Sequence, residues 1–466
     1  MSQKSNISRR SFLGTSMAGA ASLVLLPSLT TPPAKKKSLI RLGFIGMGRQ
    51  AMFLLNGFLQ IEGVEVIAGA DVYGIKRQRF EKRVTGFYAG KGKKVEVQTY
   101  EKYQDLLKRS DIDAVVIAVP DHWHAFIAIA ACNAGKDVYL EKPLTFTIQE
   151  GIELVKTVRR NKRILAVGSQ QRSDPNFQYA VKLVQKGIIG KVQKINAYVG
   201  GPPTPYNLPQ EPIPDDLNWD IWLGPNPYVH YNHELDPPIS LDPPKDEDIW
   251  GAWRWYKETG GGFTTDWGAH MFDIAQWGLG MDHSGPVEIT PPGYQDAKFL
   301  TYKYANGVVM TEEPFDEKLT KGVKFWGAKG WIEVARGYFN ASDPKLIKKD
   351  DKKDTGPYET KIPHQVNFIE SVRKRKDPVV PVEIGHRSCT VCNLGNIAYD
   401  LGRTIHWDPK AQVFVNDPEA DKHIQRVYRE GYILPSSYCT SKIRGQQPLI
   451  LSFEGKRNQL QINKKY

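Results

Sequence analysis

The sequence predicts an α/β protein, with a doubly wound parallel sheet in an N-terminal domain and an open, mostly antiparallel sheet in a C-terminal α+β domain. Apolar runs of strand length alternate with helical patterns between residues 38 and 170, which is typical of a parallel sheet covered by helices on both faces. Beyond residue 171 the strand-like runs are joined by hairpin turns instead. The chain has 466 residues, 41% hydrophobic and 24% charged, so it is long and apolar enough for two domains.

The strands of the first domain are expected to be short and apolar. They are expected at 39–45, 64–70, 114–119, 137–140 and 164–167. Helical patterns lie between them, notably at 125–134 and 148–161. Ligands of such sheets bind beyond the carboxyl ends of the strands. Those ends carry the polar segments 120–124 and 141–143, which are therefore candidates for a binding site.

The turn after the first strand reads Gly-Met-Gly-Arg-Gln-Ala over residues 46–51 and leads into an apolar helical pattern. In this context the first glycine permits a tight turn, the second lets the backbone approach a pyrophosphate, and the small last residue lets helix and strand pack closely. Asp71 ends the second strand 25 residues after Gly46. That is close to the spacing of about 20 for the acid that binds a ribose hydroxyl. The pattern predicts a Rossmann NAD-binding domain over 38–170.

Asp71 also favours NAD over NADP, because a carboxylate repels a 2′-phosphate; Lys76 and Arg77 lie close by in the sequence. The predicted cofactor contacts are Gly46, Met47, Gly48, Arg49, Gln50, Asp71, Pro120, His124, Glu141 and Lys142.

Glu141-Lys142-Pro143 directly follows a strand, and Pro143 keeps Lys142 extended at the rim of the sheet, where its ammonium can polarise a substrate hydroxyl. Together with the glycine turn, this motif makes the sequence resemble the glucose-fructose oxidoreductase / inositol dehydrogenase (Gfo/Idh/MocA) family of NAD(P)-dependent sugar oxidoreductases. The segment 364–408 resembles the C-terminal portion of the exported, twin-arginine branch of that family. The resemblance implies an NAD-dependent enzyme with a carbohydrate or glycoside substrate.

The segment 260–273 resembles the family's D-x-x-x-H helix start, which implies that His270 is the acid/base, Lys142 its electrostatic partner and Asp266 a substrate-orienting carboxylate. On one helix Asp266 and His270 would share a face. A structural alternative is that Asp266 caps the helix and His270 packs beneath Trp267. Further substrate candidates are His122, Trp253, Trp267 and Asp273.

His122 and His124 fit two interpretations: one of them contacts ribose or substrate, or both are structural histidines at a helix start. No H-x-x-x-H or H-E-x-x-H motif is present, so no metal is expected, although these two histidines with His270 remain an alternative.

The second domain is expected over 171–408, with a strand at 192–199 and hairpins that turn at 306–307 and 328–330. Its insert, 201–259, is rich in proline and tryptophan, which favours a carbohydrate-binding cleft over a disordered linker. For each single tryptophan, the alternative is that its buried side chain holds the loop against its own domain. We expect a helix over 386–401 that packs near the first domain, and a peripheral extension over 409–466.

The composition excludes some classes of function. The formal net charge is +12, but basic residues are interspersed with acidic ones and no nucleic-acid-binding motif appears. Cys389 and Cys392 form a C-x-x-C inside an apolar helical pattern; structural packing is favoured over a redox pair.

Residues 1–34 are expected to be a twin-arginine signal segment, with Arg9 and Arg10 before an apolar stretch. It predicts export to the periplasm of a protein folded around its cofactor. No stable membrane insertion is expected unless the signal stays uncleaved. An open sheet also makes a homo-oligomer, dimer or tetramer, plausible.

The leading hypothesis is hydride transfer from a secondary alcohol of a sugar or glycoside to a tightly held NAD, with NADP the less favoured cofactor. The alternative is an NAD-dependent glycoside hydrolase that works by transient oxidation and elimination. A non-enzymatic sugar- or NAD-binding scaffold is a third interpretation.

Overall fold

The computed structural model describes residues 39–242, 250–314, 321–347 and 361–435. The predicted signal segment, 1–34, lies outside the described residues, as does the end of the chain from residue 436. None of the helices in these ranges is long and apolar enough to cross a membrane.

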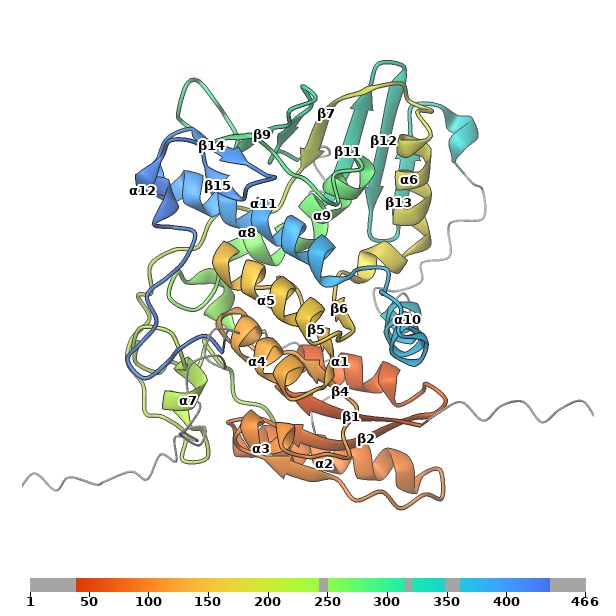
Figure 1. Ribbon diagram of the computed structural model, residues 1–466, viewed down its shortest axis with the longest axis vertical. Helices are drawn as coiled ribbons and strands as arrows, with labels where there is room; N and C mark the ends of the chain where they lie inside the picture. The colour runs from red at the N-terminus through yellow and green to blue at the C-terminus, as the bar shows by residue number, and fades with distance from the viewer. Residues whose placement is uncertain (1–38, 243–249, 315–320, 348–360, 436–466) are drawn as a thin grey trace, which may run out of the picture. The chain divides into compact units, whose positions relative to one another are not determined.

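The first domain is built on a six-stranded parallel sheet in the order β3-β2-β1-β4-β5-β6 (Figure 1). Its strands are β1 (Ile40–Ile45), β2 (Val64–Ala70), β3 (Gln98–Tyr100), β4 (Ala114–Ile117), β5 (Asp137–Leu140) and β6 (Leu165–Val167). Five of them confirm the sequence prediction. The sixth, β3, has no buried residue, so it carries no apolar run that would have predicted it.

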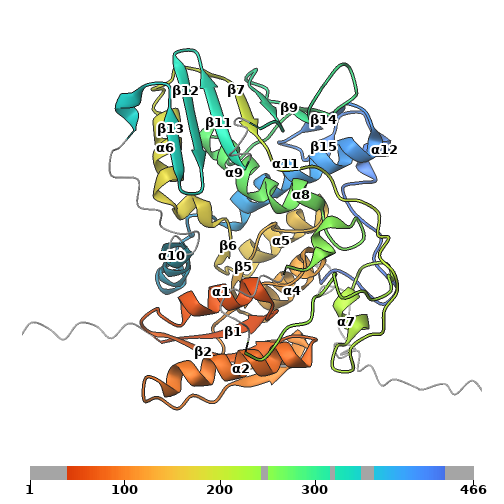
Figure 2. The ribbon, with the colours of Figure 1, turned by 180° about the vertical axis from the view of Figure 1, so that it is seen from behind.

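Helices cover both faces of this sheet, which confirms the doubly wound class. They are α1 (Arg49–Phe58), α2 (Gly74–Ala89), α3 (Tyr103–Leu107), α4 (Asp121–Asn133) and α5 (Ile148–Arg160). Figure 1 shows α4 and α5 in front of the sheet, and Figure 2, from behind, shows α1 and α2 on the opposite face. Each face has its own apolar core. A helix from much later in the chain, α10 (Lys361–Lys374), completes the α1 face, where Phe368 packs edge-on against Phe58 and Tyr139.

The second domain is an open mixed sheet whose described strands follow the order β13-β12-β11-β7-β10-β9-β8-β14-β15. They are β7 (Val192–Ala197), β8 (Glu288–Thr290), β9 (Thr301–Lys303), β10 (Val309–Thr311), β11 (Gly322–Gly327), β12 (Gly330–Ala335), β13 (Tyr338–Ala341), β14 (Ile405–Asp408) and β15 (Val413–Phe414). All pairs are antiparallel except β7 with β10. Both predicted hairpins are present, and Gly307 and Gly330 adopt the positive φ that their turns require.

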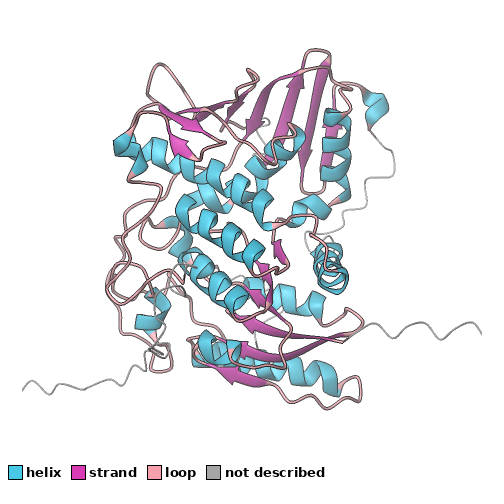
Figure 3. Ribbon diagram, in the orientation of Figure 1, coloured by secondary structure: helices cyan, strands magenta, loops and turns pink. Residues whose placement is uncertain are grey.

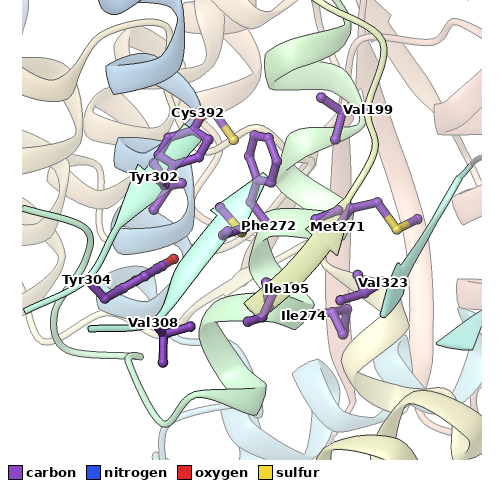
Figure 4. Close-up of a cluster of buried hydrophobic side chains, with 14 of the residues drawn as sticks. Ile195, Val199, Met271, Phe272, Ile274, Tyr302, Tyr304, Val308, Val323 and Cys392 are labelled. Carbon is purple, nitrogen blue, oxygen red and sulfur yellow. The ribbon is translucent and has the colours of Figure 1, made fainter. Parts of the chain in front are cut away.

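Helices pack on one face of this sheet (Figure 3). The second domain contains η1 (Gln170–Ser173), α6 (Pro175–Gln185), α7 (Trp219–Leu223), η2 (Ala252–Trp255), α8 (Gly262–Asp266), α9 (Gly268–Gly278), η3 (Pro344–Leu346), α11 (Val382–Leu401) and α12 (Pro418–Asp421). Figure 4 shows Met271 and Phe272 of α9 beside Ile195 of β7 and Tyr302 of β9. The rings of Phe272 and Tyr302 meet edge-on at 5.2 Å.

The helix expected at 386–401 begins four residues earlier, at Val382, directly after Pro381. It contacts the first domain as predicted, and Cys389 Sγ donates to the carbonyl of Thr145 at 3.1 Å. Two helices of the second half, α10 and α11, therefore pack on the domain that was expected to end at residue 170.

The expectation of a peripheral extension from residue 409 is wrong as far as residue 435. β15 pairs with β14, and the following chain returns to α4. There Tyr428 packs on Phe126 with ring centroids 5.0 Å apart, and Tyr432 packs on Trp123 at 5.8 Å. These aromatic side chains have enough apolar area to dock the segment against the first domain.

The insert docks on the first domain at the loop after β2. Tyr73 bridges to Leu217, the backbone N–H of Gly74 donates to the Asp216 carbonyl, and that of Asn218 donates to Val72. Trp219 and Trp222 stack at 4.5 Å inside an apolar cluster of the insert. Both tryptophans therefore hold the loop of the insert in place, and Trp222 also lines a cavity. The expected role of the insert in a carbohydrate-binding cleft stays a prediction.

Candidate active site

A cavity of about 530 Å³ lies beyond the carboxyl ends of the parallel strands. Its walls come from the glycine turn, the ends of β2, β4 and β5, the insert, and helices α8 and α9. The predicted residues that line it are Gly46, Gly48, Arg49, Gln50, Asp71, Pro120, Glu141, Lys142, Trp253, Asp266, Trp267 and His270. The position agrees with the rule that ligands of open α/β sheets bind at the strand ends.

The glycine turn leaves its backbone open to this cavity. Gly46 has φ +82°, and a Cβ there would lie 2.4 Å from the carbonyl oxygen of Ala118, so only glycine fits. A Cβ on Gly48 would meet no atom within 4 Å. Since α1 begins at Arg49, the N–H groups of its first turn lie at the cavity wall. The turn therefore fits a pyrophosphate.

Asp71 stands at the end of β2 and lines the same cavity. Its Oδ2 accepts a hydrogen bond from the backbone N–H of Met47 at 2.7 Å, and its Oδ1 accepts one from Tyr73 at 2.9 Å. The carboxylate is thereby fixed next to the glycine turn, as a ribose-binding acid must be. Met47 contributes its backbone to this arrangement, because its side chain is fully buried in the core.

Lys142 and Asp266 form the charged centre of the cavity. Lys142 Nζ donates to Asp266 Oδ1 at 2.6 Å and to the Asp266 carbonyl at 3.0 Å. Arg254 Nε lies 3.6 Å from the same carboxylate. Burial raises the pKa of Asp266, but the Lys142 and Arg254 cations outweigh burial and hold that pKa below its ordinary value. Asp266 is therefore ionised and fixes the position of the Lys142 ammonium.

His270 lines the cavity and is 7% exposed. Its ring lies 5.8 Å from that of Trp267, centroid to centroid. The expectation of one helix carrying both Asp266 and His270 is wrong, because α8 ends at Asp266 and α9 begins at Gly268. No side chain caps α9 at Trp267, so Asp266 is not its cap.

Glu141 holds the loop between Lys142 and the glycine turn. Its Oε1 accepts hydrogen bonds from Gln50 Nε2 at 2.8 Å and from Gln170 Nε2 at 2.7 Å. Gln50 belongs to the first turn of α1, so this carboxylate ties the end of β5 to the predicted pyrophosphate site. Gln170 lines the cavity and was not predicted from the sequence.

Two predicted histidines lie outside the cavity lining. His122 Nε2 lies 2.9 Å from the Trp222 carbonyl and Nδ1 lies 3.2 Å from that of Thr259, which ties α4 to the insert. His124 contacts the carbonyls of Pro143 and Val119. Burial lowers the pKa of His122 to about 3 and that of His124 to about 4. Both are neutral near pH 7, and the geometry favours the structural interpretation.

Asp273 also points away from the cavity. Its Oδ2 accepts from Arg172 Nε at 2.8 Å and its Oδ1 accepts from Ser388 Oγ at 2.6 Å. Arg172 in turn contacts Asp282. The sequence interpretation failed here because three residues along a helix turn a side chain by about 60° relative to His270, and a buried guanidinium occupies that direction.

Among the charged residues of the cavity that were given no role from the sequence are Asp121, Arg254 and Arg336. Asp121, the first residue of α4, is 4% exposed and lines the cavity. Burial raises its pKa to about 7, helped by Asp266 and opposed by Lys142 and Arg254. Arg254 lies over the Trp253 ring at 4.2 Å, and Arg336 lies over the Trp267 ring at 4.8 Å. Asp121 could have been predicted as a site residue, because it directly follows Pro120 at a strand end. No sequence pattern marks the two arginines.

The two cysteines of the C-x-x-C are free and buried in α11. Burial raises the pKa of the Cys389 thiol to about 11 and also raises the pKa of Cys392 well above its ordinary value. Among the described residues no group of three or more His, Cys, Asp or Glu side chains is arranged to hold a metal ion.

A glycine turn at the end of a parallel sheet, with a lysine–aspartate pair and a histidine in the same cavity, defines the class of nucleotide-dependent oxidoreductases. Comparison with family models gives two matches. Residues 40–169 match "Oxidoreductase family, NAD-binding Rossmann fold", and residues 181–434 match "Oxidoreductase family, C-terminal alpha/beta domain". The chain belongs to this family, Gfo/Idh/MocA, and NAD is the cofactor of its first domain.

Curated relatives include a "Glycosyl hydrolase family 109 protein 2" of Shewanella sp. (strain ANA-3), 31% identical over 211 residues. A "Glycosyl hydrolase family 109 protein" of Shewanella baltica (strain OS155) is 28% identical over 207 residues. The matches cover 40% of this chain and 45% and 44% of those proteins, so the chain spans about half the length of the curated relatives it matches.

Solved structures share the fold. The WlbA dehydrogenase from Bordetella pertussis, in complex with NADH and UDP-GlcNAcA, has a TM-score of 0.58 at 18% identity and covers 80% of this chain and 98% of its own. The scyllo-inositol dehydrogenase from Lactobacillus casei, with NAD(H) and scyllo-inositol bound, has a TM-score of 0.53 at 15% identity, with 79% and 99% covered.

Proposed function

We propose that this protein is an NAD-dependent oxidoreductase that oxidises a secondary alcohol of a sugar or glycoside. The observation that carries the proposal is the convergence of Lys142, Asp266 and His270 on the cavity that also holds the glycine turn. The chemistry that bound NAD supplies is acceptance of a hydride from the carbon that bears the hydroxyl.

The residues of the chain would divide the remaining work. His270 removes the hydroxyl proton, and a positioned acid/base of this kind contributes about 10²–10⁴-fold in rate. The Lys142 ammonium, held by Asp266, stabilises the negative charge that develops on the same oxygen. Asp266 orients the lysine, and its carboxylate is also an acceptor for a neighbouring sugar hydroxyl.

The walls of the cavity fit a carbohydrate. Trp253, Trp255 and Trp267 line it, and flat aromatic faces suit the apolar C–H faces of a pyranose ring. Arg254 and Arg336 add donors for hydroxyl groups on the same walls. The relatives of known structure named above were solved with an inositol and a nucleotide sugar.

The test compares Lys142→Met and His270→Asn with the wild-type protein over a panel of sugars and glycosides, with turnover followed by NADH absorbance and product analysis. Lys182→Met, a change of an exposed lysine on α6, is the matched control. Turnover should fall by about 10²-fold or more in both active-site variants while both still bind NAD and the control keeps full turnover. Full turnover by either active-site variant would reject the assignment.

The Shewanella relatives favour a second candidate, NAD-dependent glycoside hydrolysis. There, transient oxidation acidifies a neighbouring C–H, the aglycone leaves by elimination, water adds and the hydride returns to the sugar carbon. A nitrophenyl glycoside separates the two candidates. Steady release of nitrophenol without net NADH means hydrolysis, whereas a keto-glycoside with stoichiometric NADH means net oxidation.

We further propose that the protein is exported to the periplasm through the twin-arginine segment, with NAD loaded before export and tightly held. The Ser-Arg-Arg-Ser-Phe-Leu sequence at 8–13 supports the route. Fusion of residues 1–38 to a reporter, with Arg9 and Arg10 changed to Lys as the control, tests it: export of the first and not of the second is expected.

The proposal of a homo-oligomer rests on the open sheet, whose face carries the exposed Trp326. Light scattering after gel filtration should give a multiple of the 52.6 kDa chain mass, less any cleaved signal.

A further inference from the structure

An ion pair in the cavity lining joins α2 of the first domain to the insert, 160 residues further along the chain. Lys76, in the first turn of α2, donates from Nζ to Asp236 Oδ1 of the insert at 2.5 Å. Each residue is 7% exposed, and both line the cavity together with Asp71. The insert thus places a second carboxylate beside the acid that binds ribose in this fold.

The position of Asp236 is fixed by its surroundings. The preceding residue, Leu235, is fully buried in the apolar cluster of the insert. The same insert is bonded to the start of α2 by the backbone N–H of Ile75, which donates to Asp216 Oδ2 at 2.8 Å. Burial alone would lower the pKa of Lys76, but the carboxylates of Asp236 and Asp71 raise it above its ordinary value, so the ammonium stays charged.

Asp236, which lines the cavity, has a second acceptor oxygen besides the one that Lys76 contacts. Both oxygens of Asp71 already accept backbone N–H groups, from Met47 and Tyr73. Asp236 Oδ2 is buried and makes no well-aligned hydrogen bond among the described residues, although the Trp222 side chain also helps to stabilise this carboxylate. A buried carboxylate oxygen that lacks a well-aligned donor is costly, and a ligand hydroxyl would relieve that cost.

The nearby cations are already engaged. Asp236 neutralises Lys76, and Arg77 donates from its guanidinium to the carbonyl of Asp71 at 2.6 Å. The group of Asp71, Lys76 and Asp236 carries two negative charges and one positive charge. A 2′-phosphate of about −2 charge would therefore meet a net negative site.

We propose that Asp236 is a cofactor-specificity residue: it accepts a hydroxyl of the adenosine ribose and keeps Lys76 from binding a 2′-phosphate, so that NAD is selected over NADP. The inference rests on the NAD site being this cavity. In this arrangement the aromatic insert supplies a second carboxylate, Asp236, beside the ribose-binding Asp71 of the Rossmann domain. The selection against NADP is then shared between two parts of the chain.

The experiment measures the dissociation constants of NAD and NADP by calorimetry on the full protein after bound nucleotide is stripped on charcoal. Asp236→Asn should narrow the NAD-over-NADP preference by about tenfold, because it frees one buried cation for the phosphate. The double variant Lys76→Met with Asp236→Asn removes that cation and should restore most of the preference.

Asp242→Asn is the matched control, because Asp242 lies in the same insert and pairs with Lys82 of the same helix, but at the surface. Its preference should equal that of wild type. Equal preferences in Asp236→Asn and wild type would overturn the proposal, as would equal preferences in the single and double variants. If Asp236→Asn does not fold, Lys76→Met alone should widen the preference by about fivefold, and an unchanged preference would overturn the proposal.

These readouts need no sugar substrate. A failure of the specificity proposal therefore leaves the proposed sugar oxidation untouched, and absence of sugar turnover leaves the measured preference valid.

Discussion

Replacement of Asp121 by asparagine is expected to stabilise the protein at alkaline pH and to leave its stability unchanged near pH 4. Burial raises the pKa of Asp121 from 3.8 to about 7, and the carboxyl faces Lys142, Arg254 and Asp266. The folded protein therefore holds a proton on Asp121 between about pH 4 and pH 7, whereas the unfolded chain releases it.

The sign and size of the effect follow from that difference. The stability of the wild-type protein falls as pH rises from 3.8 through about 7, and the loss is complete above pH 7. At about 1.4 kcal/mol per pKa unit, a shift of about three units corresponds to roughly 4 kcal/mol. Asparagine has a similar shape and no charge, so Asp121→Asn avoids this loss.

Thermal unfolding of both proteins from pH 4 to pH 8.5 measures the effect, because the difference between variant and wild type cancels all other titrating groups. The variant should gain a few degrees in Tm above pH 7 and nothing near pH 4. A Tm difference that does not change with pH, or that is larger at low pH, would show that the folded protein does not hold a proton on Asp121.

Three further changes are expected to separate roles within the site. Gly48→Ala should leave Tm unchanged, since the added Cβ meets only open space, and should weaken NAD binding. Gly46→Ala should lower Tm. Equal effects of the two substitutions on Tm would contradict this prediction. Asp273→Asn should destabilise the fold by about 3 kcal/mol, because it leaves Arg172 without its main buried partner, and a change in KM at full stability would instead support a substrate contact. Iodoacetamide should modify Cys389 only after unfolding, as mass spectrometry of digests can show; labelling of the native protein would restore the redox interpretation.

The sequence was sufficient for the parts of the fold that depend on local pattern. Five of the six parallel strands are buried apolar runs, and the glycine turn has a motif whose first glycine, Gly46, is required by the backbone geometry. β3 was missed because its three residues are partly exposed. The packing of Tyr428 and Tyr432 on α4 was missed because two tyrosines far from any motif give no local signal.

The positions of site residues that directly follow a strand were predictable from the sequence. The positions that depend on tertiary contacts were not. Lys142 and Asp71 lie where the strand pattern places them. The helical spacing of Asp273 suggested that it lies beside His270 in the site. The buried Arg172, from a distant segment, instead holds the Asp273 side chain away from the cavity. Asp236 has no motif, and only the docking of the insert brings it to Lys76.

A crystal structure of the protein with NAD bound would show whether the cofactor and the catalytic side chains meet in this cavity. We predict that the pyrophosphate lies over the backbone of the 46–51 turn and that the nicotinamide ring lies within contact distance of Lys142 and His270. A nicotinamide ring in contact with neither side chain, or a dinucleotide bound away from the glycine turn, would contradict it.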